Sequence, residues 1–228
     1  MIEIPTGLPA ELVPLSWLLG VWQGTGVLDY LVGERRIQRE FGQRVSFSHD
    51  GQPYLNYSSS TWLIGDDEVD AASAPSAEPT EPGDTAAALE LGDDSAAARH
   101  LAAESGYWRL ARPLTDADAG PAMLPGVGER PYTNAESVET LRNASGGFDI
   151  EVSLVHPDGV SELYLGQIAG PRIDLATDAV LRSPSAKEYS AATRLYGLVE
   201  GHLLWAWDIA ALGQDLRTHA SARLAKVD

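Results

Sequence analysis

The clearest regularity in this chain is an alternation of apolar and polar residues over residues 148–154. Every second side chain is apolar, and Asp149, Glu151 and Ser153 occupy the positions between them. A period of two is that of a β-strand that buries one face. A His-Pro-Asp-Gly turn at 156–159 follows, and residues 160–168 resume an apolar pattern. The two segments therefore predict a β-hairpin.

Other segments rich in β-branched and aromatic residues predict further strands. They begin at residue 20 and then cover 43–48, 54–63, 101–110, 172–176, 189–199, 203–209 and 216–227. Residues 8–19, with Leu15, Trp17 and Leu18 as apolar anchors, predict a short helix or one helical turn. No long segment has the 3.6-residue period of an amphipathic helix. Many short strands in one domain, here residues 1–228, are typical of an antiparallel sandwich or barrel, and the pattern leaves both open.

Two segments interrupt this pattern. Residues 66–98 contain ten acidic residues and no Lys or Arg, and the rest of the segment is mostly Ala, Pro and Ser. Such a composition buries too little apolar surface to offset the entropy of ordering, so we expect a disordered acidic insertion. The weaker alternative is a segment that docks a basic partner. A Pro- and Gly-rich stretch near 112–145 predicts a second loop insertion.

Composition excludes several classes of function. The net charge is −17, but without residues 66–98 the chain has 23 acidic and 16 basic residues, a net charge of −7. No basic patch favours nucleic acid or an anionic membrane. The chain has no cysteine, which excludes disulfides, thiolate catalysis and iron–sulfur clusters. Residues 12–22 are too short and too interrupted to span a bilayer, so we expect a cytoplasmic protein.

The five histidines do not form the paired spacing of a zinc site. His156 and His202 adjoin turns, so we expect both to be exposed to solvent. His100 borders the acidic insertion and is also expected to be exposed, and His49 ends a predicted strand. Neither a Gly-x-Ser-x-Gly elbow nor a well-placed carboxylate pair indicates hydrolytic catalysis.

His219 lies near the start of the last predicted strand, where alternation opposes an inward position. Thr218, Ala220, Ala222 and Leu224 share one face, and His219 lies on the other. If the first face points into the core, His219 points outward unless the strand contains a bulge or the ligand lies at the rim.

Two more features of the sequence need a structural interpretation. The pattern Gly20-x-Trp22-x-Gly24-x-Gly26 is interpreted as architectural: the indole plugs one end of a small barrel, and the glycines permit bending and close backbone approach. Asp208 lies in an apolar run and is either a buried, hydrogen-bonded acid or a residue facing water. We favour the second interpretation.

Several motifs, in order along the chain, resemble the nitrobindin family of small haem-binding β-barrels, which are related in shape to fatty-acid-binding proteins. They are residues 18–24, 47–55, 104–109, 154–159, 175–178, 185–188 and 210–219. The resemblance covers most of the chain outside 66–98 and about 112–145.

The resemblance implies a ten-stranded antiparallel up-and-down barrel that holds one haem b near its mouth. The family's proximal ligand follows an Ala-Ala-x-Gly-Gln-x-Leu run, and His219 occupies that position. Residues 30–37 are expected to border the haem. Members are associated with nitric oxide binding and with isomerisation of peroxynitrite to nitrate, and a homodimer is compatible with the resemblance.

The alternative is a haem-free, fatty-acid-binding-like carrier of a small apolar ligand. In that interpretation Arg35 or Arg36 pairs with the ligand's carboxylate, although exposed arginines are the simpler expectation.

Overall fold

The computed structural model of the chain describes residues 7–32, 35–65, 69–70, 99–211 and 217–227. Most of these residues form a single antiparallel sheet. Its strands are β1 (Gly20–Val32), β2 (Arg35–Ser48), β3 (Leu55–Leu63), β4 (Val69–Asp70), β5 (His100–Leu110), β6 (Phe148–Val155), β7 (Val160–Ala169), β8 (Arg172–Arg182), β9 (Tyr189–Val199), β10 (His202–Ala211) and β11 (Arg217–Val227).

The sheet closes on itself. Apart from the two-residue strand β4, which adds to β2, each strand pairs with its neighbours along the chain, and β1 pairs with both β2 and β11. The result is a closed, up-and-down barrel of ten antiparallel strands, as the resemblance implied. Each of the ten barrel strands therefore pairs on both sides, although β8 and β9 pair with each other only over 172–176 and 193–197.

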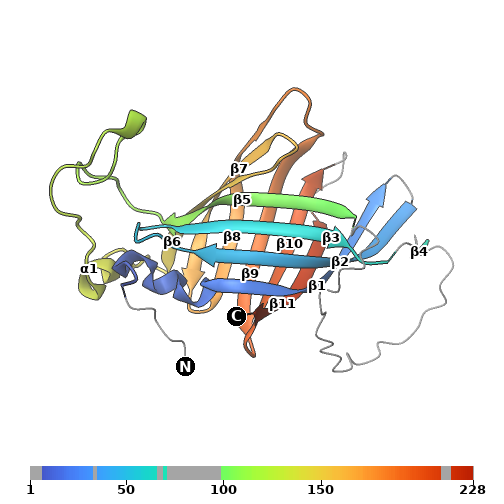
Figure 1. Cartoon of the computed structure of the whole chain (residues 1–228), viewed down its shortest axis with the longest axis horizontal. Helices are drawn as coiled ribbons and strands as arrows, with labels where there is room; N and C mark the ends of the chain where they lie inside the picture. Colours follow the sequence, from blue (N-terminus) through green and yellow to red (C-terminus); the bar gives the residue numbers. More distant parts are fainter. Residues whose placement is uncertain (1–6, 33–34, 66–68, 71–98, 212–216, 228) are drawn as a thin grey trace.

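The predicted N-terminal helix closes one end of the barrel. It is a 3₁₀ helix, η1 (Ala10–Leu18), whose residues Leu12, Leu15 and Leu18 are fully buried. The Trp22 indole lies beneath it and donates a hydrogen bond to the Leu18 carbonyl at 2.7 Å. The final residues of β1, β8 and β10 lie at the other end of the barrel, which we call the mouth (Figure 1).

The glycines of the first strand allow close approach of its neighbours. A Cβ atom at Gly24 would collide with the Arg223 carbonyl of β11, and one at Gly26 would collide with the Phe41 ring and the Ser221 carbonyl. Gly20 has a φ of +118°, a conformation that favours glycine. Gly24 and Gly26 therefore lie where a neighbouring strand approaches β1 too closely for a side chain.

Strand β2 is longer than its pattern predicted. The prediction covered 43–48, whereas the strand begins at Arg35. The first half of β2 carries charged residues on its outer face, including Arg36 and Glu40. For this reason the segment lacks the β-branched and aromatic composition on which the prediction relied. Pairing with all of β1 nevertheless holds this segment in the barrel.

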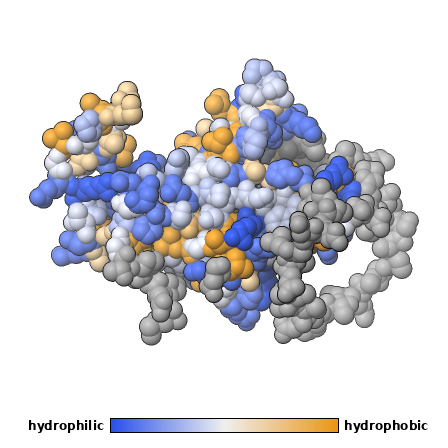
Figure 2. Space-filling view, viewed as in Figure 1, coloured by the Kyte–Doolittle hydropathy of each residue, from blue (hydrophilic) through white to orange (hydrophobic). Residues whose placement is uncertain are grey.

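The two predicted insertions have different outcomes. Residues 66–68 and 71–98 lie outside the described residues, so the expectation of disorder there is not tested. The connection from 111 to 147 contains η3 (Pro121–Met123), in a part that projects from the barrel, and α1 (Ala135–Glu139), which packs beside η1 and buries Val138 (Figure 1). Hydrophobic side chains gather on its outer part (Figure 2), where Met123 and Val127 are exposed. None of the helices in the described part of the chain is long and apolar enough to cross a membrane.

Candidate functional site

His219 occupies a β-bulge at the mouth. On the neighbouring strand β10, Trp207 pairs with Ala220, and the next residue, Asp208, pairs with Thr218. His219 is therefore an extra residue on β11 that opposes no partner on β10. The bulge shifts the alternation by one residue. Ala220 is buried on the inner face, Thr218 lies on the outer face, contrary to the simple alternation, and His219 lies between them.

Two aromatic rings enclose the His219 imidazole. The Tyr30 ring stacks on it, with ring centroids 4.7 Å apart and planes at 25°. The Trp207 ring meets it edge to face, with centroids 5.8 Å apart. Both aromatic residues pack against the barrel core, so His219 faces the interior. Tyr30 belongs to the segment that the resemblance expected to border the haem.

The surroundings of His219 favour its neutral form. Burial lowers the pKa of the imidazole, and the positive charge of Arg217 lowers it further. A neutral imidazole has a free nitrogen lone pair, which is the form that binds a metal. The site thus keeps its histidine ready to act as a ligand near neutral pH.

Trp207 connects this site to the deeper interior. The Tyr189 ring lies edge to face with it at 6.4 Å, and the Arg194 guanidinium lies 4.7 Å from the centre of its ring. Its indole Nε1 is buried and has no hydrogen-bond partner among the described residues. By contrast, the Trp205 Nε1 on the same strand donates to Gln43 Oε1 at 2.7 Å.

A buried charge network lies below Trp207, and the sequence analysis missed it. Arg194 of β9 donates to both carboxylate oxygens of Glu104 of β5, at 2.9 and 2.8 Å, and its Nε donates to the Tyr164 hydroxyl at 3.0 Å. Glu162 of β7 lies 3.5 Å from the same guanidinium. These residues project inward from strands far apart in the sequence, so no local motif links them.

The Glu162 carboxylate contacts several further polar groups. The Tyr164 and Tyr189 hydroxyls both donate to it, and His156 Nε2 lies 2.6 Å from its second oxygen. The side chain of His156 is 13% exposed, so the prediction of an exposed turn residue is wrong. The ring instead reaches Glu162, whose side chain is fully buried and whose negative charge attracts it.

Opposing effects set the ionisation of this network. Burial raises the pKa of Glu104, but the Arg194 charge and its hydrogen bonds outweigh burial and bring that pKa to about 2. Burial lowers the pKa of His156, but the hydrogen bond to Glu162 and the charges of both glutamates raise it above its ordinary value. The carboxylates are therefore ionised, and the network holds a compensated set of charges inside the barrel.

The other candidate residues lie away from the mouth interior. His100 is exposed as predicted, His49 accepts a hydrogen bond from the Gly51 amide in the β2–β3 turn, and His202 lies 3.0 Å from the Glu200 carbonyl at the closed end. Arg36 forms an exposed ion pair with Asp29. The Arg35 side chain lies outside the described part of the structure.

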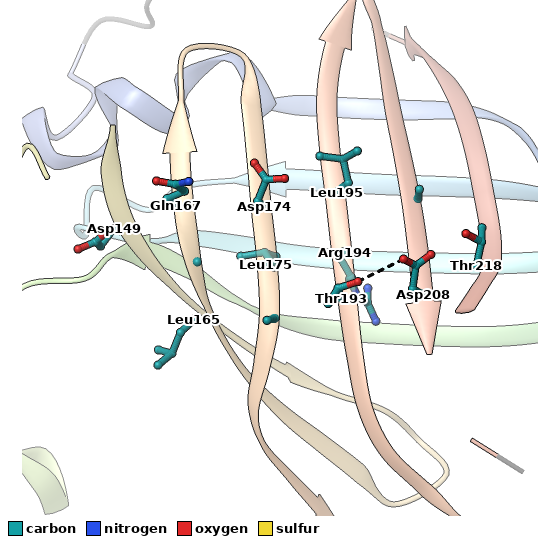
Figure 3. A pocket seen from close by; sticks show the side chains of 13 residues that line it. Asp149, Leu165, Gln167, Asp174, Leu175, Thr193, Arg194, Leu195, Asp208 and Thr218 are labelled. Atoms are coloured by element: carbon teal, nitrogen blue, oxygen red, sulfur yellow. Dashed lines mark hydrogen bonds between the residues drawn. The ribbon is translucent and has the colours of Figure 1, made fainter. Parts of the chain in front are cut away.

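Asp208 lines a groove on the outer wall of the barrel. The groove has a volume of about 680 Å³, and Asp208 accepts a hydrogen bond from Thr193 at 3.5 Å across β9 and β10 (Figure 3). Asp174 and Thr218 line the same outer groove. The favoured interpretation of Asp208 as a residue on the solvent side agrees with this position.

Comparison with known proteins identifies the family. The model of the THAP4-like, heme-binding beta-barrel domain matches residues 11–226. The chain belongs to this haem-binding barrel family. The family indicated by the sequence resemblance is thereby confirmed, and a haem-free carrier is not favoured.

Relatives of this haem-binding barrel carry a common name. The chain is 64% identical to the peroxynitrite isomerase of Leifsonia xyli subsp. xyli and 63% identical to that of Clavibacter michiganensis subsp. michiganensis, in both cases over the whole of both chains. The crystal structure of Rv2717c from M. tuberculosis is 23% identical, with a TM-score of 0.60, covering 99% of this chain and 100% of that one. The last similarity concerns the fold.

The donor set around His219 fits haem better than a bare metal ion. Among the residues described, no group of three or more His, Cys, Asp or Glu side chains could hold a metal ion. A haem needs only one axial side chain because its macrocycle supplies the in-plane ligands. A neutral imidazole between two aromatic rings meets that requirement.

Proposed function

We propose that this barrel binds one ferric haem b per chain through His219 and isomerises peroxynitrite to nitrate. The observation that carries the proposal is the β11 bulge, which gives His219 an inward position between Tyr30 and Trp207. The names of the close relatives support the reaction.

The chain's own residues would act by binding and orienting. His219 would donate a nitrogen lone pair, and the Tyr30 ring would limit rotation of the imidazole. The apolar walls would restrict water at the reacting centre. When bound, ferric haem supplies a metal centre that accepts an anionic oxygen ligand, and the protein sets access and electrostatics around it.

An absorbance titration with ferric haem tests the binding step. We expect saturable one-to-one binding with a shifted Soret band for the wild type and loss of stable binding for H219A. The matched control is H202A, which removes a histidine at the closed end of the barrel and should bind like the wild type. An unchanged Soret band in H219A would refute the ligand assignment.

Stopped-flow kinetics test the reaction. Haem-loaded wild type should accelerate peroxynitrite decay and raise the nitrate yield, and H219A should do neither. A wild type without specific haem binding, but with co-purified lipid detected by mass spectrometry, would favour the carrier instead. Binding of nitric oxide, which the family resemblance supports, is a further part of this proposal. So are a homodimeric state and a cytoplasmic location, the latter supported by the short, interrupted apolar run at residues 12–22.

A further inference from the structure

The unpaired indole of Trp207 is the feature of the site that remains unexplained. A buried N–H group without a partner carries the full penalty of its lost hydration. Two other interior indoles have partners, since Trp22 donates to the Leu18 carbonyl and Trp205 donates to Gln43. Trp207 is left with a buried donor directly beside the candidate ligand His219.

An unpaired indole alone does not indicate a ligand, because Trp17 and Trp108 also lack partners in the described structure. Both of those residues belong to the closed, apolar part of the core. Trp108 is fully buried among the rings of Phe47, Tyr57 and Tyr196. Trp207 differs because it is only partly buried and contacts the imidazole at the mouth.

The charge below Trp207 indicates what its N–H would bind. The Arg194 guanidinium lies 4.7 Å from the centre of the indole ring, and a cation over the ring draws electron density from it. This polarisation strengthens the N–H as a donor and favours an anionic acceptor. The nearby carboxylates do not fill this role, since Glu104 and Glu162 bind Arg194, His156 and the tyrosine hydroxyls instead.

We propose that Trp207 donates its indole N–H to an anionic oxygen of the group that binds at His219. This inference rests on the proposed function. Two sources have this chemistry: a carboxylate at the haem periphery and an oxyanion bound to the iron. In either case Trp207 is a binding residue of the site. The ligand oxygen accepts the hydrogen bond that the indole N–H lacks in the protein alone.

The test compares W207F with the wild type in a ferric haem titration. Phenylalanine keeps an aromatic ring beside His219 and removes the donor. If the acceptor is a haem carboxylate, we expect the haem affinity of W207F to fall at least about tenfold, as for a lost hydrogen bond to a charged group. If the acceptor is an iron-bound oxyanion, the affinity for that anion should fall instead. The matched control is W108F, which also removes a buried, unpaired indole N–H and should bind haem like the wild type.

Two further titrations distinguish a haem carboxylate from an iron-bound oxyanion as the acceptor of this hydrogen bond. With haem dimethyl ester, which lacks the carboxylates, a haem-carboxylate contact predicts that W207F and wild type bind equally. With the haem-loaded proteins, an iron-bound oxyanion predicts an unchanged haem affinity and a weaker affinity of W207F for nitrite. Equal losses for haem and its ester would indicate a packing role and overturn the proposal.

The failure of this inference can be distinguished from failure of the proposed function. If H219A abolishes haem binding while W207F matches the wild type in every titration, only the Trp207 proposal is overturned. If the wild type does not bind haem, both are overturned. Should W207F not fold, the wild-type indole N–H signal provides the test. Gallium protoporphyrin IX, alone or together with nitrite, should slow its exchange with solvent, and unchanged exchange in both cases would contradict the proposal.

Discussion

The imidazole of His219 stacks on the phenol ring of Tyr30, with centroids 4.7 Å apart and planes at 25°. The ladder between β1 and β11 ends at the pair Leu28 and Ala220, two residues before Tyr30 and one residue after His219. The ring contact therefore continues the association of the two strands where their backbone pairing stops. It fixes the candidate ligand by a side-chain contact at the mouth of the barrel.

Replacing Tyr30 should change haem binding through the orientation of His219. We expect Y30A to weaken haem affinity about two- to tenfold, since an aromatic pair contributes about 0.5–1.5 kcal/mol. Y30F keeps the stacked ring and should remain close to the wild type. Haem titration of the three proteins checks this, and equal affinity of Y30A and wild type would show that the stack does not position the imidazole.

Arg194 should be essential for stability. R194M leaves the buried carboxylates of Glu104 and Glu162 without their cation, and breaking such a pair costs about 3–5 kcal/mol. The control is R172M, which breaks the exposed ion pair with Asp174 and should change stability little. Urea unfolding of both variants measures the difference. Similar losses for the two would contradict the description of a buried, compensated network.

The two buried histidines should give opposite pH dependences of stability. The pKa of His156 is raised in the folded state, so its contribution is complete below the unfolded pKa near 6.5 and is lost as pH rises through the folded value. The pKa of His219 is lowered, so its contribution is present above the unfolded pKa and is lost as pH falls.

The free energy of unfolding of the haem-free protein, measured by urea unfolding between pH 5 and 9, gives these two pH dependences. Relative to H156Q, the wild type should lose stability as pH rises; relative to H219A, it should lose stability as pH falls. The His156 slope reflects the charges that face it: Glu104, Glu162 and Arg194. Parallel slopes for the two comparisons would contradict the assigned environments.

Gly26 should not tolerate a side chain. A Cβ atom there would collide with the Phe41 ring and with the Ser221 carbonyl, so G26A should destabilise the barrel by about 1–3 kcal/mol. Gly197 on β9 is the matched control, since a Cβ atom there would meet only the Pro171 carbonyl at 3.8 Å. Thermal unfolding compares the variants, and equal stability of G26A and G197A would show that β1 can shift away from β11.

The strands with one buried face were predictable because alternation records burial directly. The segments of β6 and β9 were predicted closely, whereas the first half of β2 was missed because charged residues such as Arg36 cover its outer face. His156 was assigned wrongly to solvent. Its turn predicted exposure, and only the fold brings it to Glu162, a residue on the next strand whose carboxylate is buried.

The sequence by itself determined a β-rich chain with short strands and turns, and its ordered motifs indicated the family and predicted His219 as the candidate ligand. The tertiary structure decided the direction of His219. Alternation within β11 predicts an outward side chain, and the bulge opposite Trp207 and Asp208 reverses it. It also decided the buried network, because Glu104 and Arg194 meet only when the strands that carry them face one another across the closed barrel. Local patterns encode burial and turns, whereas register shifts and contacts across a closed sheet depend on how distant strands pair.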